Sequence, residues 1–584
     1  MFTAPLRSLR RRMTAAALIA FALSATLTAI PAVASPADKV SLADLDITGL
    51  QQLLTEGTLT SVDLVTMYEA RIAAYDDDPE SGIAAVIALN PDAISDAGTL
   101  DAERAAGAVR GPLHGIPVLI KDNIDVAGMP TTGGSNALRD FVPNIDSTQV
   151  AMLREAGAII LAKTNLHEFA TGITTLSSLG GQTRNPYDLT RDPGGSSGGT
   201  AAGVASAFAP AGLGSDTGGS VRIPASHNSL VGLRPTFGLS SRHGVLPISY
   251  SQDSVGPIAT TVRDVALLMD ATVGADPKDR ATQVSQRDAV ESYVDALSKT
   301  TLDGATIGLV VNPEFLGTGT ESEQQTTTVI RAAVAELEGR GAMVSEVTLP
   351  DEIVKNLTGD AIPFYEARRD MNAYFAEEDA SFPAELAALA EPLDTLTVSD
   401  LVASGDVGEV VAPLLAAADG ITLPSADYDG LLAIRDDLQA SVATFFAEGE
   451  YDALVYPSLR QPGAPLGDAP PKKEAADLVG IIGYPAISVP AGVTSDGMPV
   501  GLELLGTPFS EAALLGYAYD YEQATHHRVP PTSVPALAGE EITLSPAETG
   551  SAPVGLIVTI CVLALLVVLA AVVIVLRRRS RTVS

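Results

Sequence analysis

The chain has very little of the chemistry that sulfur and imidazole groups supply. Its 584 residues include one cysteine, six histidines and no tryptophan. The cysteine, Cys561, lies in an apolar run near the C-terminus, which excludes disulfides, cysteine-bound zinc and a thiol nucleophile from the rest of the chain. No HExxH sequence or other close histidine–carboxylate spacing typical of a metal site occurs. We therefore expect chemistry based on hydroxyl, amine and carboxylate groups.

Positive charge is also scarce. Lysine and arginine total 36 against 71 aspartates and glutamates, which gives a net charge of −35. Such a surface repels phosphate backbones, so we predict that the protein does not bind nucleic acid. With 46% hydrophobic and 18% charged residues the composition is globular, and the length allows one large domain or several ordinary ones.

The two ends of the chain have the patterns of export and membrane segments. Residues 1–34 combine an arginine-rich start, an apolar stretch and an A-x-A sequence, which predicts a cleaved signal peptide. Residues 554–576 carry no charge and are long enough to cross a bilayer. Arginines in the tail, residues 577–584, favour the cytoplasmic side for that end. These patterns predict an exported cell-surface protein, with its ectodomain outside the cell and a C-terminal transmembrane helix.

A Ser-, Pro- and Glu-containing stalk, residues 536–553, precedes the predicted transmembrane helix. Within it, residues 546–550 (PAETG) are similar to a cell-wall sorting signal of Gram-positive bacteria, but they depart from L-P-x-T-G at the first two positions. Two outcomes stay open. The helix remains as a permanent anchor, or a sortase cleaves between Thr549 and Gly550 and attaches the protein to the cell wall.

Between these ends, apolar strands alternate with helices. Residues 60–63 (TSVD) are typical of a helix start, and apolar side chains at helical spacing continue that helix to about residue 74. Short apolar runs at residues 116–120 and 158–162 predict buried strands. Ser147 is expected to cap the helix before the second of these strands. The alternation indicates an α/β protein.

Two clusters of glycine and serine carry the candidate chemistry. In residues 194–199 (GGSSGG) two hydroxyls precede a helix-forming run, where free N–H groups and the helix dipole favour negative charge. Residues 214–222 (GSDTGGSVR) can bend so that several N–H groups converge beside one hydroxyl, as in an oxyanion hole.

Each cluster alone has other interpretations. The first also fits the G-x-S-x-G elbow of α/β-hydrolases, so an esterase that uses His526 or His527 is an alternative. Glycine-rich packing turns without chemistry are another. A phosphate-binding loop is excluded because no lysine follows either cluster.

Together the clusters make the chain similar to the amidase signature family, whose signature spans residues 194–225. The similarity continues at residues 110–122 (RGPLHGIPVLIKD), 484–492 (YPAISVPAG) and 497–506 (GMPVGLELLG). The resemblance implies the family's α/β fold, with a single large amidase domain over residues 35–535. In that fold a mixed, twisted β-sheet is covered by helices.

The resemblance also implies a Ser-Ser-Lys triad of Lys121, Ser196 and Ser220. In it Ser220 is the nucleophile, and Ser196 carries protons between Ser220 and Lys121. The peptide bond between Gly195 and Ser196 is cis in this family. Lys163, which also ends a predicted strand, is the rival for the role of the lysine.

Further groups are implied around the triad by the same resemblance. Backbone N–H groups form an oxyanion hole, and other side chains support the loops. The oxyanion residues are Thr217, Gly218 and Gly219, and the supporting residues are Ser197, Asp216 and Arg222. Neither a metal nor an organic cofactor is implied.

Elementary chemistry agrees with a lysine as the base. Serine attacks an amide only when a base takes its proton, and an amine can do so only when it is neutral. Holding an amine with a reference pKa of about 10.4 neutral at pH 7 costs roughly 4–5 kcal/mol. Burial in a pocket without carboxylates lowers the pKa of a lysine by that order.

We therefore predict an extracellular amidohydrolase that cleaves a carboxamide through a seryl acyl-enzyme. The expected substrate is a small-molecule or peptide amide. Residues 364–375 resemble a helix of family members that act on peptide amides and small amides, which favours a peptide C-terminal amide or a small amide. The non-enzymatic alternative is a catalytically inactive surface-binding protein on the same scaffold. The sequence predicts no oligomeric state.

Overall fold

A computed structural model of the chain describes residues 39–78, 81–283, 290–357, 359, 361–376, 380–381 and 396–544. Residues 41–540 form one compact unit. A separate unit contains the residues before and after it, in which β1 (Lys39–Val40) pairs antiparallel with β17 (Ile542–Thr543). The predicted signal peptide, transmembrane helix, tail and sorting motif lie outside the described residues.

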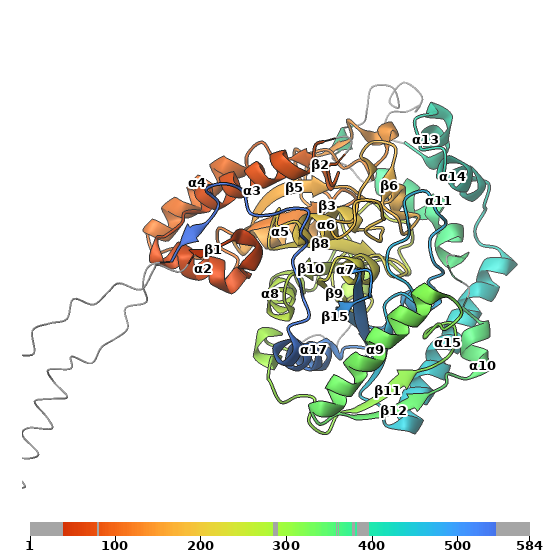
Figure 1. The fold of residues 1–584 in the computed structure, drawn as a ribbon. Coiled ribbons are helices and arrows are strands. Elements are labelled where there is room, and N and C mark those ends of the chain that lie inside the picture. The colour runs from red at the N-terminus through yellow and green to blue at the C-terminus, as the bar shows by residue number, and fades with distance from the viewer. Residues whose placement is uncertain are drawn as a thin grey trace, which may run out of the picture. The chain divides into compact units, whose positions relative to one another are not determined.

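The described part of the compact unit is built on one sheet of eleven strands (Figure 1). In spatial order they are β12 (Met343–Val347), β11 (Thr306–Val310), β14 (Ala453–Pro457), β16 (Pro499–Leu505), β15 (Ala486–Val493), β9 (Val231–Arg234), β10 (Ser254–Ala259), β8 (Ala211–Asp216), β3 (Pro117–Lys121), β5 (Ile159–Thr164) and β2 (Val86–Leu89). β3 is parallel to β5 and β8, and β11 is parallel to β12 and β14. The other neighbouring pairs are antiparallel. This arrangement confirms the predicted mixed α/β fold.

Helices pack against this sheet along most of its length. α6 contacts β3 and β8, α7 contacts β9, β15 and β16, and α9 contacts β15 and β16. The α-helices in the described residues are α2 (Ile47–Glu56), α3 (Ser61–Tyr75), α4 (Ala93–Ala105), α5 (Thr148–Glu155), α6 (Gly198–Ala205), α7 (Arg222–His227), α8 (Val262–Thr272), α9 (Glu321–Gly339), α10 (Asp351–Lys355), α11 (Ala361–Phe375), α13 (Val398–Ser404), α14 (Ala412–Asp419), α15 (Ala426–Gly449), α16 (Glu474–Ile482) and α17 (Glu511–Thr525).

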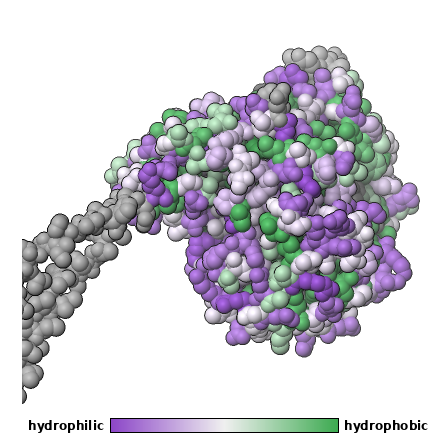
Figure 2. Space-filling view, in the orientation of Figure 1, coloured by the Kyte–Doolittle hydropathy of each residue, from purple (hydrophilic) through white to green (hydrophobic). Residues whose placement is uncertain are grey.

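Short elements complete the described fold. Two further sheets have two strands each: β4 (Val142–Pro143) with β13 (Ala380–Ser381), and β6 (Leu176–Ser177) with β7 (Gly181–Gln182). The 3₁₀ turns are η1 (Leu42–Asp44), η2 (Asn136–Leu138), η3 (Glu168–Ala170), η4 (Arg280–Gln283) and η6 (Val294–Ala296). Figure 2 shows hydrophilic residues over much of one face, with hydrophobic residues in small groups between them, as is usual for the exterior of a folded domain.

Local sequence signals set the first elements as predicted. The Thr60 hydroxyl accepts from the N–H of Asp63 and the Asp63 carboxylate accepts from the N–H of Thr60, so a capping box starts α3. The Ser147 hydroxyl caps α5 by accepting from the N–H of Val150 at 3.2 Å, without the reciprocal bond of a capping box. β3 and β5, the two predicted apolar strands, are buried along their whole lengths.

The prediction of a C-terminal transmembrane helix as part of the fold is wrong for the part of the chain that the structure describes. No helix there is both long enough and apolar enough to cross a membrane. The two longest, α9 and α15, have the length but carry several acidic side chains, starting in their first turns. The segment predicted to span, residues 554–576, lies outside the described residues.

Candidate active site

The site lies where neighbouring parallel strands end. β3 ends at Lys121 and β8, its parallel neighbour, ends at Asp216. Since the carboxyl ends of parallel strands meet at one edge of a sheet, this pairing brings the lysine to the loop that follows β8. That loop carries Ser220 and leads into α7, while the turn before α6 carries Ser196.

Lys121 is fully buried and bound to serine oxygens. Its Nζ atom lies 2.7 Å from Oγ of Ser196 and 2.8 Å from Oγ of Ser215. It also donates to the carbonyl oxygen of Ser215 at 3.2 Å. Asn123 donates to Oγ of Ser215 at 3.1 Å, which holds that hydroxyl beside the amine. The sequence analysis did not single out Ser215, although it lies inside the second cluster.

Burial lowers the pKa of Lys121 to about 7. A pocket without carboxylates was expected, and this is wrong. The negative charges of Asp216 and Asp253 lie close enough to raise the pKa of Lys121, against the effect of burial. Desolvation is the larger effect. A substantial fraction of the amine is therefore neutral at neutral pH, which is the state that can take a proton from Ser196.

The turn before α6 has an unusual backbone. The peptide bond between Gly195 and Ser196 is cis, as the family resemblance implied. Gly194 has a φ of 76°, and a Cβ atom there would lie 2.9 Å from the backbone of Pro224, so glycine is required at this position. The N–H of Ser197 donates to the carbonyl oxygen of Ser220 at 3.1 Å, which ties this turn to the loop of Ser220.

Asp216 organises the loop that carries Ser220. One of its carboxylate oxygens accepts from the N–H of Gly219 at 2.8 Å and the other from the N–H of Val221 at 3.0 Å. Burial opposes ionisation of Asp216, but the guanidinium groups of Arg222 and Arg234 and these two N–H groups outweigh it and lower its pKa. The loop is therefore fixed on both sides of Ser220 by one anion.

A second carboxylate completes this buried charge cluster. Arg222 forms an ion pair with Glu503 of β16 as well as with Asp216, and all three side chains are fully buried. Arg234, at the end of β9, donates to Asp216 at 2.9 Å. The sequence analysis missed Arg234 and Glu503. A lone charge inside an apolar strand, GLELLG, was the signal that could have found Glu503.

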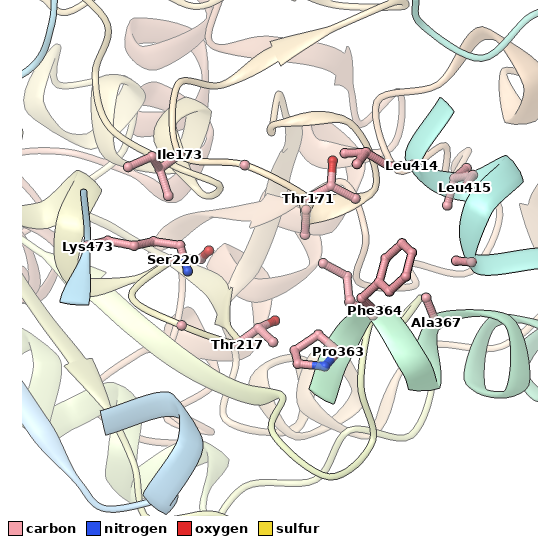
Figure 3. Close-up of a pocket in the computed structure, with 15 residues that line it drawn as sticks. Thr171, Ile173, Thr217, Ser220, Pro363, Phe364, Ala367, Leu414, Leu415 and Lys473 are labelled. Atoms are coloured by element: carbon pink, nitrogen blue, oxygen red, sulfur yellow. The ribbon is translucent and has the colours of Figure 1, made fainter. Parts of the chain in front are cut away.

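Ser220 opens into a pocket of about 160 Å³ (Figure 3). Thr217 and Gly218 line the pocket beside it, whereas Gly219 does not. The rest of the lining is mostly apolar and comes from the segment 170–173, residue 248, α11 and α14. Its apolar side chains are those of Ala170, Ile173, Ile248, Pro363, Phe364, Ala367, Leu414, Leu415 and Ala418.

Among the residues that line this pocket, Lys473 is the one with a charged side chain. Its side chain extends toward Ser220 in the view of Figure 3. It precedes α16 and forms an ion pair with Asp477 in the first turn of that helix. The sequence analysis placed no function on either residue.

The rival catalytic groups lie elsewhere. Lys163 is buried in an ion pair, with its Nζ atom 3.1 Å from Oδ1 of Asp122, and it also donates to the carbonyl of Pro130. Its third partner is the hydroxyl of Thr131, so Lys163 hydrogen-bonds to neither serine of the predicted triad. His526 and His527 line a different cavity, which neither Ser196 nor Ser220 lines. The described residues contain no group of three or more His, Cys, Asp and Glu side chains that could hold a metal ion.

Comparison with known proteins identifies the family. The model of the amidase family matches residues 63–515, so the chain belongs to the amidase family. It is an enzyme of the class that acts on amide bonds, which disfavours the esterase alternative for the first cluster.

Relatives of two kinds are similar over most of the chain. The glutamyl-tRNA(Gln) amidotransferase subunits A of Synechococcus sp. (strain CC9902) and Moorella thermoacetica are 37% and 36% identical, over 82% of this chain and 96% and 95% of theirs. The peptide amidase of Stenotrophomonas maltophilia is 37% identical, with a TM-score of 0.74 over 84% of this chain and 98% of its own.

These comparisons correct the predicted location. Two findings show that the prediction of a cell-surface membrane protein with a C-terminal anchor is wrong. Relatives that match most of the chain are amidotransferase subunits, and no described helix can cross a membrane.

Proposed function

We propose that the protein hydrolyses a carboxamide through an acyl-enzyme on Ser220, with Ser196 passing protons between Ser220 and Lys121. The observation that carries this proposal is the 2.7 Å contact between Nζ of Lys121 and Oγ of Ser196. A buried amine with a pKa of about 7 supports the role of a base. We assign the activity to residues 35–535, which contain the matched residues 63–515.

Each proton in the proposed reaction has a defined place. Neutral Lys121 takes the proton of Ser196 as Ser196 takes the proton of Ser220, and Oγ of Ser220 bonds to the amide carbon. When the C–N bond breaks, the proton returns through Ser196 to the leaving nitrogen, which departs as ammonia or an amine. Water then attacks the ester by the same relay, releasing the acid and restoring Ser220.

Backbone N–H groups of the Ser220 loop stabilise the oxyanion in this proposal. Thr217 and Gly218 line the pocket, which favours them as donors. The N–H of Gly219, the third predicted donor, already donates to Asp216 at 2.8 Å, so its main role in this proposal is to hold the loop. Loss of one oxyanion donor typically costs 10²–10³ in rate. Ser197, Asp216 and Arg222 support the two loops.

The substrate we propose is a peptide C-terminal amide or a small amide with an apolar acyl part. The apolar wall of the pocket and the similarity to a peptide amidase support this choice. A tRNA-dependent role, as the names of the amidotransferase relatives indicate for those proteins, is disfavoured here by the net charge of −35, which repels RNA.

The test is release of ammonia from an N-blocked peptide amide by the full chain, in the absence of any tRNA. We expect turnover by the wild type and by Ser95→Ala, a matched control at an exposed serine of α4, and none by Ser220→Ala. Turnover of the corresponding esters alone, or full activity of Ser220→Ala, contradicts the proposal.

A further inference from the structure

Asp253 is a buried carboxylate that lies outside the two glycine–serine clusters in sequence and contacts the Ser220 loop directly. Its Oδ1 atom accepts the Thr217 hydroxyl at 2.5 Å, and its side chain is almost fully buried. Oδ2 accepts from the N–H groups of Ile248 and Ser249, each at 3.0 Å. Every contact uses a carboxylate oxygen as an acceptor, which favours the ionised form, whereas burial raises the pKa of Asp253.

The segment that Asp253 holds is itself bound to the helix of the pocket wall. The hydroxyl of Ser249 donates to Glu366 of α11 at 2.6 Å, and the N–H of Tyr250 donates to Asp370 of α11, also at 2.6 Å. Glu366 is fully buried and also binds the hydroxyl of Tyr428 on α15. Unbroken hydrogen bonding therefore runs from the loop of the serine to α11.

Both ends of this chain of hydrogen bonds line the same pocket. Thr217 lies beside Ser220 on one side, and Ile248 lies on the wall with Phe364 of α11. Oδ1 of Asp253 accepts from the Thr217 hydroxyl and Oδ2 accepts from the N–H of Ile248, so Asp253 joins the two sides of the pocket.

We propose that Asp253 is a positioning residue, which fixes the oxyanion loop through Thr217 and couples it to the substrate-binding wall through the segment 248–251. This inference rests on the proposed function, because it takes the Ser220 loop as the reacting one. Asp253 acts through Thr217 and Ile248 and touches no reacting atom in this role.

The charge of Asp253 gives a second, independent readout. Asp253 and Asp216 both raise the pKa of Lys121, against the effect of burial. The other charged groups that face Asp253 are Arg234 and Arg242. Removing the negative charge of Asp253 lowers the pKa of Lys121, so the proposed base is neutral at lower pH and the acid limb of the pH–rate profile moves down.

Two variants separate the two effects. Thr217→Val removes the hydroxyl but keeps the shape and the backbone N–H, so we expect kcat to fall about tenfold with the acid limb unmoved. Asp253→Asn keeps the size but removes the charge and two acceptor sites. For it we expect a fall in kcat of about tenfold or more, a raised KM, and an acid limb about half a pH unit lower.

The control for loss of a buried carboxyl group is Asp264→Asn, at another buried aspartate that accepts from the backbone N–H of Ile47 and lies outside the pocket. Burial raises the pKa of Asp264 to about 8, so this control tests the loss of buried acceptor atoms and not the loss of charge. We expect its kcat, KM and pH profile to equal those of the wild type. The measurements are full pH profiles of peptide-amide hydrolysis on the full-length chain, with thermal melting of each variant.

Three results overturn the inference: a wild-type kcat in Thr217→Val, a wild-type pH profile in Asp253→Asn, or the same losses in Asp264→Asn. If Asp253→Asn does not fold, Thr217→Val alone still decides the positioning claim. An inactive Ser220→Ala with a normal Asp253→Asn rejects only this inference, whereas an active Ser220→Ala rejects the proposed function first.

Discussion

In the proposed mechanism, Lys121 determines the pH range in which the protein works. The amine acts as a base only when it is neutral, and burial places its pKa at about 7. We therefore predict that kcat/KM for a peptide amide is level above pH 8 and falls about tenfold per pH unit below pH 6. Asp216, whose pKa is lowered, stays ionised throughout and adds no limb in this range.

The measurement is a pH–rate profile of the wild type beside that of Arg331→Met, a control at the exposed ion pair of Arg331 with Glu346. A profile that is flat from pH 5 to pH 9, with protein that stays folded, contradicts a neutral lysine as the base.

The buried charges around Asp216 make Arg222 a structural requirement. Removing its guanidinium leaves Glu503 without its ion pair in a fully buried position. We predict that Arg222→Met costs about 3–5 kcal/mol in the free energy of unfolding. The pair of Arg331 with Glu346 has side chains 49% and 57% exposed, so Arg331→Met is expected to cost less than about 1 kcal/mol. Chemical denaturation of both variants checks the difference, and equal losses contradict it.

The sequence could predict the residues of this cluster that lie close to Ser220 along the chain, but not those that lie far from it. Asp216 and Arg222 lie in one motif with Ser220, so a pattern of local residues includes them. Arg234 and Glu503 reach the same cluster only because β9 and β16 lie near each other in the sheet, and Asp253 only because β10 pairs with β8. No local pattern encodes those contacts.

Helix α11 forms much of the apolar wall, so it should determine how tightly a substrate is bound. Phe364 and Pro363 of its first turns line the pocket. We predict that Phe364→Ala raises KM for an amide with an apolar acyl part about tenfold and leaves kcat within about twofold, since lost apolar burial weakens ground state and transition state alike.

Tyr365, the next residue on the helix, stacks on Tyr428 and does not line the pocket, which makes Tyr365→Ala the matched control. Steady-state kinetics on both variants test the wall. A KM that rises equally in both, or in neither, shows that the substrate does not contact α11.

The elements themselves were predictable where capping and burial act locally, as for α3, α5, β3 and β5. The role of α11 was predicted only in outline, from its resemblance to a helix of substrate-binding relatives. The contribution of α14 was not predicted, because Leu414 and Leu415 reach the pocket through packing against α11. Such packing depends on the whole fold.

For the molecule as a whole, an ion pair joins the beginning of the compact unit to its end. Arg71 of α3 binds both carboxylate oxygens of Glu540, at 2.7 and 2.9 Å, and both side chains are buried. We predict that Glu540→Gln lowers the free energy of unfolding by about 3 kcal/mol. Activity at 25 °C should be unchanged, because neither residue lines the pocket of Ser220.

The neighbouring Glu541 provides the control, since its ion pair with Lys39 is more than half exposed. Glu541→Gln should unfold at the same denaturant concentration as the wild type. Loss of amidase activity in Glu540→Gln under folding conditions would contradict a purely structural role for the pair.

The mixed sheet was predictable as a family property, but the order of its eleven strands was not, because most neighbours in the sheet are far apart in sequence. The predicted cell-surface anchor was wrong for a different reason. That prediction used the hydropathy of residues 554–576 alone. The relatives match the amidase part of the chain, and no described helix can cross a membrane.

The central claim is that Ser220 is the nucleophile. Its most direct test is labelling of the full chain with a fluorophosphonate, followed by mass spectrometry of the peptides that contain the two glycine–serine clusters. We predict a single adduct on Ser220, formed faster above pH 7 than at pH 5, and absent in Ser220→Ala. An adduct on Ser196 or Ser197, or labelling that persists in Ser220→Ala, would contradict the account.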